Sequence, residues 1–355
     1  MSKPLRTILL ALGIITASAI LSVMGFVVFL SVTEFSPPMK LSPVIHGNGR
    51  PMDPAQREFT FLTWNIGYAG LGKEMDFFYD GGKQVRPGKE QCKGYFDGIR
   101  NLLQSRDTAD FIFLQETDVH SKRSWYRDEF SEISGILPGF FNVFAPNYDC
   151  RFVPVPLTDP MGRVVSGLAC FLRPEPGNAG IHYFTGTVPW PKRLVYLKRC
   201  YLLFRFKLDS GKELVIINTH NSAYDSTGAL RRNELAALGL VMNAEYGKGN
   251  YVVAGGDWNN NPRGFSPSTV RSGDAVVPIE PEIDPSFVPG WQFVFDSARP
   301  TNRNVDMPYA KGVTKTTIID FFVVSPNVEV THIETIPAGF AFSDHQPVEV
   351  RVRLK

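Results

Sequence analysis

The sequence predicts an α/β sandwich, in which two packed sheets carry helices on their outer faces, preceded by one N-terminal transmembrane helix. Apolar runs of strand length outnumber the helical patterns, and the helical patterns fall between the strands. A long segment without a charge lies at the N-terminus. Acids, amides and two histidines recur at the ends of the apolar runs, which is typical of side chains that assemble into one functional site.

The composition fits one large globular domain with appendages. The chain has 355 residues, of which 43% are hydrophobic and 20% are charged. The net charge of +2 gives no large positive field, so it neither requires nor excludes a nucleic-acid partner. The four cysteines show no spacing suited to zinc, and Cys170 and Cys200 lie in apolar runs, where we expect buried thiols. A disulfide in an oxidising compartment remains open.

Residues 7–31 are predicted to form a transmembrane anchor, because about 20 apolar residues span a bilayer as a helix. Lys3 and Arg6 lie close to the segment on its N-terminal side. The positive-inside rule therefore places residues 1–6 in the cytoplasm and the body of the protein outside it. A signal peptide cleaved after Ala17-Ser18-Ala19 is the alternative. The apolar run continues to Leu30, which favours an uncleaved, single-pass anchor.

Residues 32–57 are predicted to be a linker, because they are rich in proline and glycine and have no periodicity. The globular body then covers residues 58–355. Apolar spacing predicts helices over 95–103, 125–136 and 230–246. Strands are expected over 59–64, 111–114, 141–144, 167–172, 201–208, 213–218, 251–254, 317–324, 328–336 and 348–354. Residues 262–289 read as one long, proline-rich loop.

Three of the polar residues after strands carry oxygen donors. Glu116 follows the run 111–114, and its carboxylate is a hard ligand suited to Mg²⁺ or Mn²⁺. Asp257 and Asn259 follow two glycines that allow a ligand to approach the backbone closely. Each of these residues, taken alone, is also compatible with a solvated loop acid or an Asx-type turn.

One asparagine, two histidines and one buried acid complete the set of candidate site residues. Asn65 and His220 end strands, and both could contact a phosphate. Asn65 could instead cap a turn, and His220 could be a half-buried histidine whose hydrogen bonds are satisfied. Asp320 lies within an apolar strand, and a buried carboxylate needs a partner. His345 is the candidate partner, and histidine is the usual general base near neutral pH.

The order of these motifs resembles that of the endonuclease/exonuclease/phosphatase superfamily, which includes deoxyribonuclease I and neutral sphingomyelinases. The resemblance covers residues 58–355, and it rests on Thr63-Trp64-Asn65, Leu114-Gln115-Glu116, Asn218-Thr219-His220, Gly256-Asp257-Trp258-Asn259, Ile319-Asp320-Phe321 and Ser343-Asp344-His345. It implies a four-layer α/β sandwich, deoxyribonuclease I-like, with two mostly antiparallel sheets and the site at one edge.

The resemblance also implies a role for each residue. Glu116 would be the main metal ligand, with Asn65 and Asp344 beside the metal. His220 would contact the phosphate, and Asp257 and Asn259 would position water and phosphate. His345 would be the general base, oriented by Asp320, although either Asp257 or His345 could take the proton from water. Asn221 departs from the family pattern, in which leucine commonly follows the histidine; we expect this change to affect packing more than chemistry.

The resulting expectation is a membrane-anchored, Mg²⁺- or Mn²⁺-dependent phosphodiesterase. Its substrate would be a nucleic acid or a phospholipid headgroup, and the sequence identifies no protein partner. Aromatic residues could contact lipid, stack on bases or pack internally, and a basic cluster could bind the phosphate of either substrate. These residues are Phe77, Phe78, Tyr79 and Trp190, and Lys192, Arg193, Lys198 and Arg199. A catalytically inactive surface binding module is the alternative, which the complete set of acids, amides and histidines disfavours.

Overall fold

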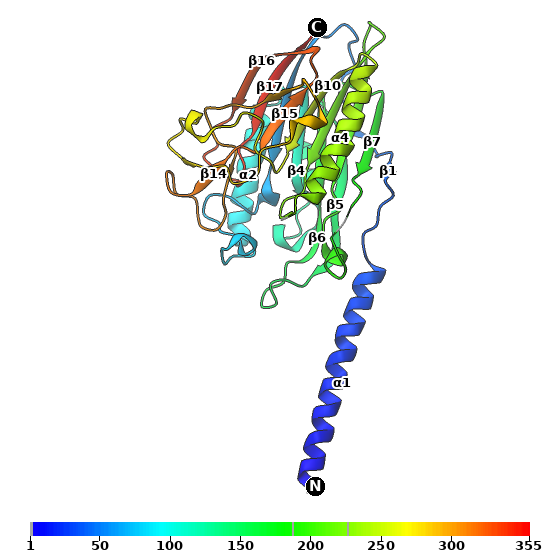
Figure 1. The fold of residues 1–355 in the computed structure, drawn as a ribbon, viewed down its shortest axis with the longest axis vertical. Helices are drawn as coiled ribbons and strands as arrows, with labels where there is room; N and C mark the ends of the chain where they lie inside the picture. The colour runs from blue at the N-terminus through cyan, green and yellow to red at the C-terminus, as the bar shows by residue number, and fades with distance from the viewer. Residues whose placement is uncertain (1–2, 187, 226) are drawn as a thin grey trace.

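A computed structural model describes residues 3–186, 188–225 and 227–355 of the chain. Figure 1 shows a body of two sheets and several helices, from which α1 (Lys3–Val32) extends as a separate rod. Within those ranges, α1 is the one helix long and apolar enough to cross a membrane. Its most apolar window has a mean hydropathy of 2.3, and none of that window is buried. It covers the predicted segment 7–31.

Two seven-stranded sheets form the body. The first has the order β1-β7-β8-β9-β10-β15-β12, with bounds β1 (Lys40–Leu41), β7 (Asn178–Tyr183), β8 (Cys200–Lys207), β9 (Glu213–His220), β10 (Tyr251–Asp257), β15 (Asp320–Val324) and β12 (Gln292–Val294). The second has the order β16-β17-β3-β4-β6-β5-β2, with bounds β16 (Val328–Thr335), β17 (Val348–Leu354), β3 (Glu58–Asn65), β4 (Phe111–Asp118), β6 (Gly162–Leu172), β5 (Phe141–Val153) and β2 (His46–Gly47).

Smaller elements surround these sheets. A three-stranded sheet contains β11 (Ala275–Val276), β14 (Lys315–Thr317) and β13 (Asn302–Arg303). The remaining α-helices are α2 (Lys89–Ser105), α3 (Glu129–Ile136) and α4 (Ala229–Gly247). The 3-10 helices are η1 (Gly67–Ala69), η2 (Phe78–Asp80), η3 (Lys122–Ser124), η4 (Lys192–Val195), η5 (Pro267–Thr269) and η6 (Pro285–Phe287).

The two large sheets pack face to face and helices cover both outer faces. Phenylalanines such as Phe61, Phe111 and Phe322 fill the space between the sheets. On the outer face of the second sheet, Phe96 of α2 joins a separate apolar cluster, and on the outer face of the first sheet Leu238 of α4 joins another. These layers confirm the predicted α/β sandwich, since burying one apolar face of each helix and sheet requires this stacking.

Each large sheet is antiparallel except for one parallel pair near its middle. β3 and β4 run parallel and are connected through α2, and β9 and β10 run parallel and are connected through α4. A parallel pair requires such a crossover, and it brings the carboxyl ends of both strands to the same edge. Each crossover therefore places two strand ends at one edge of its sheet.

The predicted helix over 125–136 is wrong in its first turn, because α3 begins at Glu129. Trp125 and Tyr126 have positive φ angles of 57° and 60°, which an α-helix does not allow. The Asp128 side chain instead accepts a hydrogen bond from the backbone N–H of Ser131 and caps the shorter helix.

Several strands were not predicted, among them β7 and β12 of the first large sheet, and the strand predicted over 317–324 is divided. Its first part is β14 in the small sheet, and its second part is β15 in a large sheet. Asp320 therefore begins β15 instead of lying inside a longer strand. β7 had no clear pattern, because Gly180 and His182 interrupt its apolar residues.

The predicted linker, 32–57, lies along the body. β1 pairs with β7, and β2 pairs with β5, so the segment adds one short strand to an edge of each large sheet. Arg50 contacts Asp110 at 3.0 Å, and Glu34 accepts from Lys198 at 2.9 Å. The lack of periodicity in the sequence correctly predicted that this segment is irregular. It could not predict β1 and β2, because a strand of two residues that pairs at the edge of a sheet leaves no sequence pattern.

Gly256, immediately before Asp257, is required where β10 approaches β9. Its φ is +148°, and a Cβ atom would lie 1.9 Å from the carbonyl oxygen of Thr219. We expect Gly256→Ala to lower the free energy of unfolding by about 1–3 kcal/mol, because the two strands must separate. Denaturant unfolding of the full chain in detergent micelles measures this change.

Gly94→Ala is the matched control. Gly94 lies in α2 with nothing within 4 Å of a new Cβ, so alanine should raise the free energy of unfolding by about 0.5–1 kcal/mol. Equal stabilities for the two variants would contradict the close approach at Gly256.

Candidate active site

The site lies where the strand ends of both sheets meet. Asn65 ends β3, Glu116 lies near the end of β4, and His220 and Asp257 end β9 and β10. β15 runs antiparallel to β10, so its first residue, Asp320, is directly paired with Asp257, which is also paired with His220. The segment before β17 adds Asp344 and His345 to the same edge. All of the predicted site residues are thus brought to one edge of the sandwich.

Glu116 is turned toward the site by an irregularity in its strand. The pairing of β4 with β6 shifts between Leu114 and Thr117, and Glu116 has a φ of +53°. Asn65 Nδ2 lies 3.3 Å from Glu116 Oε1 and donates at 3.0 Å to Asp257 Oδ2. The amide oxygen of Asn65 accepts from the N–H of Gly67 at 3.0 Å, which fixes the orientation of the amide. Asn65 therefore links carboxylates from both sheets.

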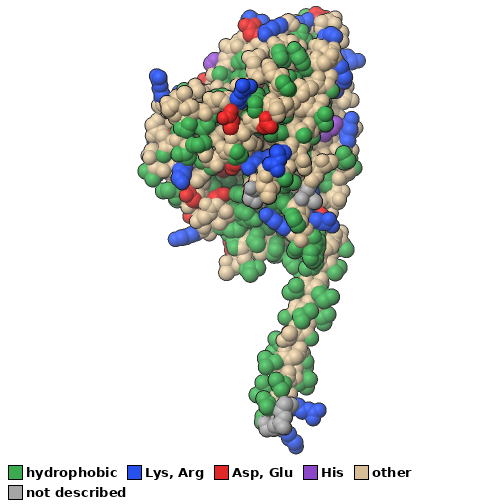
Figure 2. All heavy atoms as spheres, viewed as in Figure 1, with side chains coloured by type: hydrophobic (Ala, Val, Ile, Leu, Met, Phe, Trp, Pro, Cys, Tyr) green, Lys and Arg blue, Asp and Glu red, His purple; other side chains and the backbone are tan. Residues whose placement is uncertain are grey.

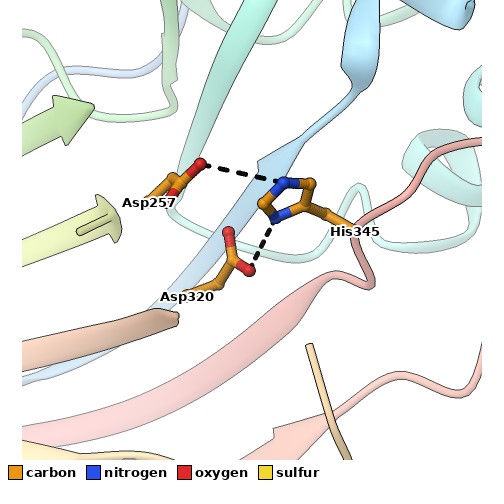
Figure 3. A group of neighbouring side chains, drawn as sticks. All are labelled: Asp257, Asp320 and His345. Carbon is orange, nitrogen blue, oxygen red and sulfur yellow. Dashed lines mark hydrogen bonds and ion pairs between the residues drawn. The ribbon is translucent and has the colours of Figure 1, made fainter. Parts of the chain in front are cut away.

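His345 is held between two aspartates, as Figure 3 shows. Its Nδ1–H donates to Asp320 Oδ2 at 2.8 Å, and its Nε2 lies 3.8 Å from Asp257 Oδ2. All three side chains are buried, and their nearest ligand-type atoms lie within 4.8 Å of one another. Because Nδ1 is already committed to the short hydrogen bond with Asp320, we interpret the trio as a hydrogen-bonded His345–Asp320 pair with the Asp257 carboxylate near Nε2, instead of a set of metal ligands.

The backbone around His345 is also fixed. Its N–H donates to Ser343 Oγ at 3.1 Å, and its carbonyl accepts from the indole of Trp64 at 3.0 Å. Nε2 lies 3.0 Å from the side-chain amide of Asn302, which can offer an oxygen to a protonated ring or a nitrogen to a neutral one. Asn302 belongs to the two-residue strand β13 in an irregular segment, so no sequence signal marked it.

The two histidines have opposite electrostatic environments. Burial alone would lower the pKa of His345, but the charges of Asp320, Asp344 and Asp257 outweigh burial and raise this pKa to about 10. Burial lowers the pKa of His220 well below its usual value, and the positive charges of Arg199 and His345 lower it further. In this arrangement His345 carries a charge at neutral pH and His220 is neutral.

Asp257 is a buried carboxylate whose pKa lies close to neutral pH. Burial raises its pKa to about 7, with the positive charge of His345 opposing this shift and the negative charge of Asp320 adding to it. His220 Nε2 lies 3.3 Å from Asp257 Oδ2. The backbone N–H of Asn259 donates to Asp257 Oδ1 at 3.0 Å. Asp257 thus has hydrogen-bond donors around it, and its raised pKa allows it to accept a proton near neutral pH.

Asn259 and Asn221 support each other. Asn259 Nδ2 donates to the carbonyl of Asn221 at 2.8 Å, which uses one of its two amide hydrogens. Asn221 Oδ1 accepts from Thr219 Oγ1 at 2.7 Å, and Asn221 is fully buried. The departure from leucine at position 221 thus provides a hydrogen bond beside the site as well as packing.

Glu116 and Asp344 form an oxygen-rich corner suited to a divalent cation. Burial raises the pKa of Asp344, His345 lowers it, and the nearby charge of Glu116 raises it. Two carboxylates that disfavour each other's charge are stabilised by a cation between them, and hard oxygen donors are those that Mg²⁺ and Mn²⁺ prefer. The donor set therefore fits such an ion, with Asn65 beside it.

A cavity of about 320 Å³ opens over these residues. Its floor includes Glu116, Asp257 and His345, and its walls carry aromatic and aliphatic side chains. The predicted aromatic cluster is divided between two roles. Phe77 and Tyr79 line the cavity, and Phe78 packs against both of them.

The predicted basic cluster is likewise divided. Arg193 and Lys198 lie near the Glu34 carboxylate, at 3.7 and 2.9 Å, whereas Lys192 and Arg199 line the cavity. Tyr68, which the sequence did not mark, also lines it, and its buried hydroxyl has no hydrogen-bond partner in the described chain. The guanidinium of Arg123 stacks 3.6 Å above the Tyr68 ring.

Comparison with known proteins agrees with this fold. The model of the Endonuclease/Exonuclease/phosphatase family matches residues 62–345. No curated protein sequence gives a significant match. Three similar solved structures share the fold at low sequence identity, and each covers most of this chain.

An endonuclease/exonuclease/phosphatase from Beutenbergia cavernae is 17% identical, covering 84% of this chain and 72% of that one, with a TM-score of 0.53. A mannosyl-6-phosphatase from Bacteroides thetaiotaomicron is 17% identical over 83% and 99%, with a TM-score of 0.52. The catalytic domain of human nocturnin, with a bound sulfate, is 16% identical over 88% and 98%, with a TM-score of 0.51. The chain therefore belongs to the endonuclease/exonuclease/phosphatase family, whose members hydrolyse phosphoester bonds.

Proposed function

We propose that this protein is a membrane-anchored, divalent-metal-dependent phosphodiesterase. The observation that carries the proposal is the meeting of Glu116, Asp344 and Asp257 with His345 at one buried edge. An anionic diester repels water and hydroxide, so its hydrolysis needs positive charge and a base close together. The substrate is a nucleic acid or a phospholipid headgroup. An inactive binding module would have no need to keep so many carboxylates buried together.

Glu116 and Asp344 would hold Mg²⁺ or Mn²⁺, with Asn65 beside them. When bound, the ion neutralises charge on the phosphate and stabilises the leaving oxygen. Asn65 fixes the position of Glu116 through its amide hydrogen bond and so keeps that carboxylate turned toward the ion.

Asp257 is the better candidate for the base that takes a proton from the attacking water. A group with a pKa of about 7 can accept a proton near neutral pH, whereas His345, with a pKa of about 10, already carries one. His345 would then donate to a phosphate oxygen as an imidazolium held by Asp320. His220 and Asn259 would supply neutral donors nearby, where charge grows during the reaction.

Metal dependence is tested by removing the ion. EDTA should abolish hydrolysis of a phosphodiester, and added Mg²⁺ or Mn²⁺ should restore it. Glu116→Gln should raise the metal concentration needed for half-maximal activity, because a ligand charge is lost. Calorimetric titration of Mn²⁺ into the full chain measures the same loss without an activity assay. Full activity in the presence of chelator would refute metal dependence.

The His345–Asp320 pair is tested by a double-mutant cycle on kcat. His345→Ala should lower kcat by about 10²–10³-fold, because one donor to the developing charge is lost. Asp320→Asn should lower kcat by acting through His345. The double variant should then be little worse than His345→Ala, because residues that act as one unit are not additive.

Glu245→Gln is the control for losing a buried carboxylate. Glu245 pairs with Arg205 at 2.7 Å outside the site, so its loss should lower the melting temperature and leave kcat unchanged. Multiplicative effects of the His345 and Asp320 variants on kcat would show that the two residues act separately.

The membrane anchor is supported by the length and apolarity of α1 and by Lys3 and Arg6 at its N-terminal end. The catalytic body would then lie on the extracytoplasmic side. Protease added to intact cells should digest the body, and membranes should retain α1. Protection of the body, or its release as a soluble form that begins near Ile20, would argue against this topology.

A further inference from the structure

The hairpin formed by β5 and β6 ends in an exposed apolar tip. Phe152, Val155 and Leu157 have exposed fractions of 36%, 37% and 88%, and no charged residue lies between Arg151 and Asp159. Figure 1 shows green loops of this region at the end of the body from which α1 leaves. An exposed apolar tip on a projecting hairpin is unfavourable in water, so we expect the tip to lie against other apolar material.

The tip lies beside the membrane helix. The rings of Phe152 and Phe26 meet edge to face, with centroids 6.0 Å apart. The uncharged segment 7–31 is about 37 Å long as a helix, whereas the apolar layer of a bilayer is about 30 Å thick. Phe26 therefore lies inside that layer whether the layer is aligned with residue 7 or with residue 31. Phe152 must then reach the apolar layer as well.

The same hairpin forms part of the wall of the active-site cavity. Val153, Val155 and Met161 line the cavity together with Val195 and Leu197 of the segment that includes η4. η4 packs against α1. Figure 2 shows hydrophobic side chains gathered on this end of the body beside the helix. The cavity thus has an apolar wall on the side of the membrane and a polar floor at Glu116, Asp257 and His345.

Two cations lie within this apolar surrounding. Arg199 lines the cavity, and its Nη1 is buried without a hydrogen-bond partner in the described part of the chain. Lys192 lies 5.2 Å from the centre of the Tyr196 ring on the same wall. A buried guanidinium nitrogen without a partner is costly, and a phosphate oxygen would satisfy it. The cavity therefore combines apolar surface, cations and the reactive carboxylates, and a phospholipid combines apolar chains with an anionic phosphoester in the same way.

We propose that the tip of the β5–β6 hairpin inserts into the bilayer beside α1, and that the cavity takes a membrane lipid with a phosphoester headgroup as its substrate. The inference rests on the proposed function and names its substrate class. A nucleic acid fits this surface less well, because its phosphates would meet an apolar rim and the net charge of the chain is only +2.

Insertion of the tip is tested by fluorescence with the full chain in vesicles of equal parts phosphatidylcholine, phosphatidylglycerol and sphingomyelin. Cys92, Cys150, Cys170 and Cys200 are buried, so an environment-sensitive nitrobenzoxadiazole label will react with a new surface cysteine. L157C should give blue-shifted emission that nitroxide-labelled lipid quenches. L240C is the control, because Leu240 is 77% exposed on α4. Equal, water-like emission at both positions would overturn the insertion.

The substrate class is tested in the same vesicles with Leu157→Asp and Leu240→Asp. Hydrolysis of the vesicle lipids is followed by mass spectrometry, and hydrolysis of soluble bis(4-nitrophenyl) phosphate is followed by absorbance. Leu157→Asp should slow lipid hydrolysis by about tenfold or more, because a charge replaces an inserted apolar side chain, and should leave hydrolysis of the soluble diester unchanged. Leu240→Asp should change neither rate.

The outcomes separate the inference from the function on which it rests. A wild-type chain that hydrolyses the soluble diester or DNA but none of the vesicle lipids overturns the lipid substrate and leaves the phosphodiesterase intact. Equal lipid hydrolysis by wild type and Leu157→Asp overturns the role of the tip. A chain that hydrolyses no phosphoester in the presence of Mg²⁺ or Mn²⁺ overturns the proposed function, and the fluorescence result still decides insertion.

Discussion

The rest of the site depends on one electrostatic constraint, which is that four carboxylates are gathered at a single edge of the sandwich. Asp257, Asp320 and Asp344 are buried, and Glu116 is largely so. Like charges this close repel one another and destabilise the fold unless positive charge and donors offset them. His345 lies between three of these acids and supplies one positive charge. The divalent cation that we propose would offset the remaining negative charge, and the same cation would attract an anionic phosphate.

Holding the carboxylates together requires the two sheets to be fixed relative to each other. Gln115 Nε2 of the second sheet donates to Asn218 Oδ1 of the first at 2.8 Å, and Asn218 Nδ2 lies near the carbonyls of Leu114 and Ala169. These amides lie between the sheets, where an unpaired polar group would be costly, so they specify one register. These two strand-end motifs thus have two functions: Gln115 and Asn218 join the sheets, whereas Glu116 and His220 face the site.

This division explains how far the sequence alone could predict the structure. Residues in strands have a periodic apolar environment, so the motif order and the sandwich were both recognisable. Asn302 reaches the cavity from a segment whose position depends on tertiary contacts, and no neighbouring pattern marks it, whereas Arg199 belongs to the basic cluster that the sequence predicted. The error at Trp125 and Tyr126 has a similar cause, because their helical spacing is real but positive φ angles are imposed by the turn that follows η3. Local patterns predicted the scaffold, and long-range contacts decided the cavity walls.

The connection between α1 and the body bears on how the site would meet a membrane. A flexible linker would let the body rotate, and the cavity would then face the bilayer only part of the time. Here the residues directly after α1 are fixed to the body, because Glu34 bridges Arg193 and Lys198, and β1 pairs with β7. Arg193 and Lys198 are next to Lys192 and Arg199 of the cavity wall, so the contacts that fix the helix to the body also fix the cavity relative to the helix. If α1 crosses a bilayer, the orientation of the cavity toward the lipid is therefore set by the fold, and diffusion of substrate within the membrane plane is enough to bring it to the site.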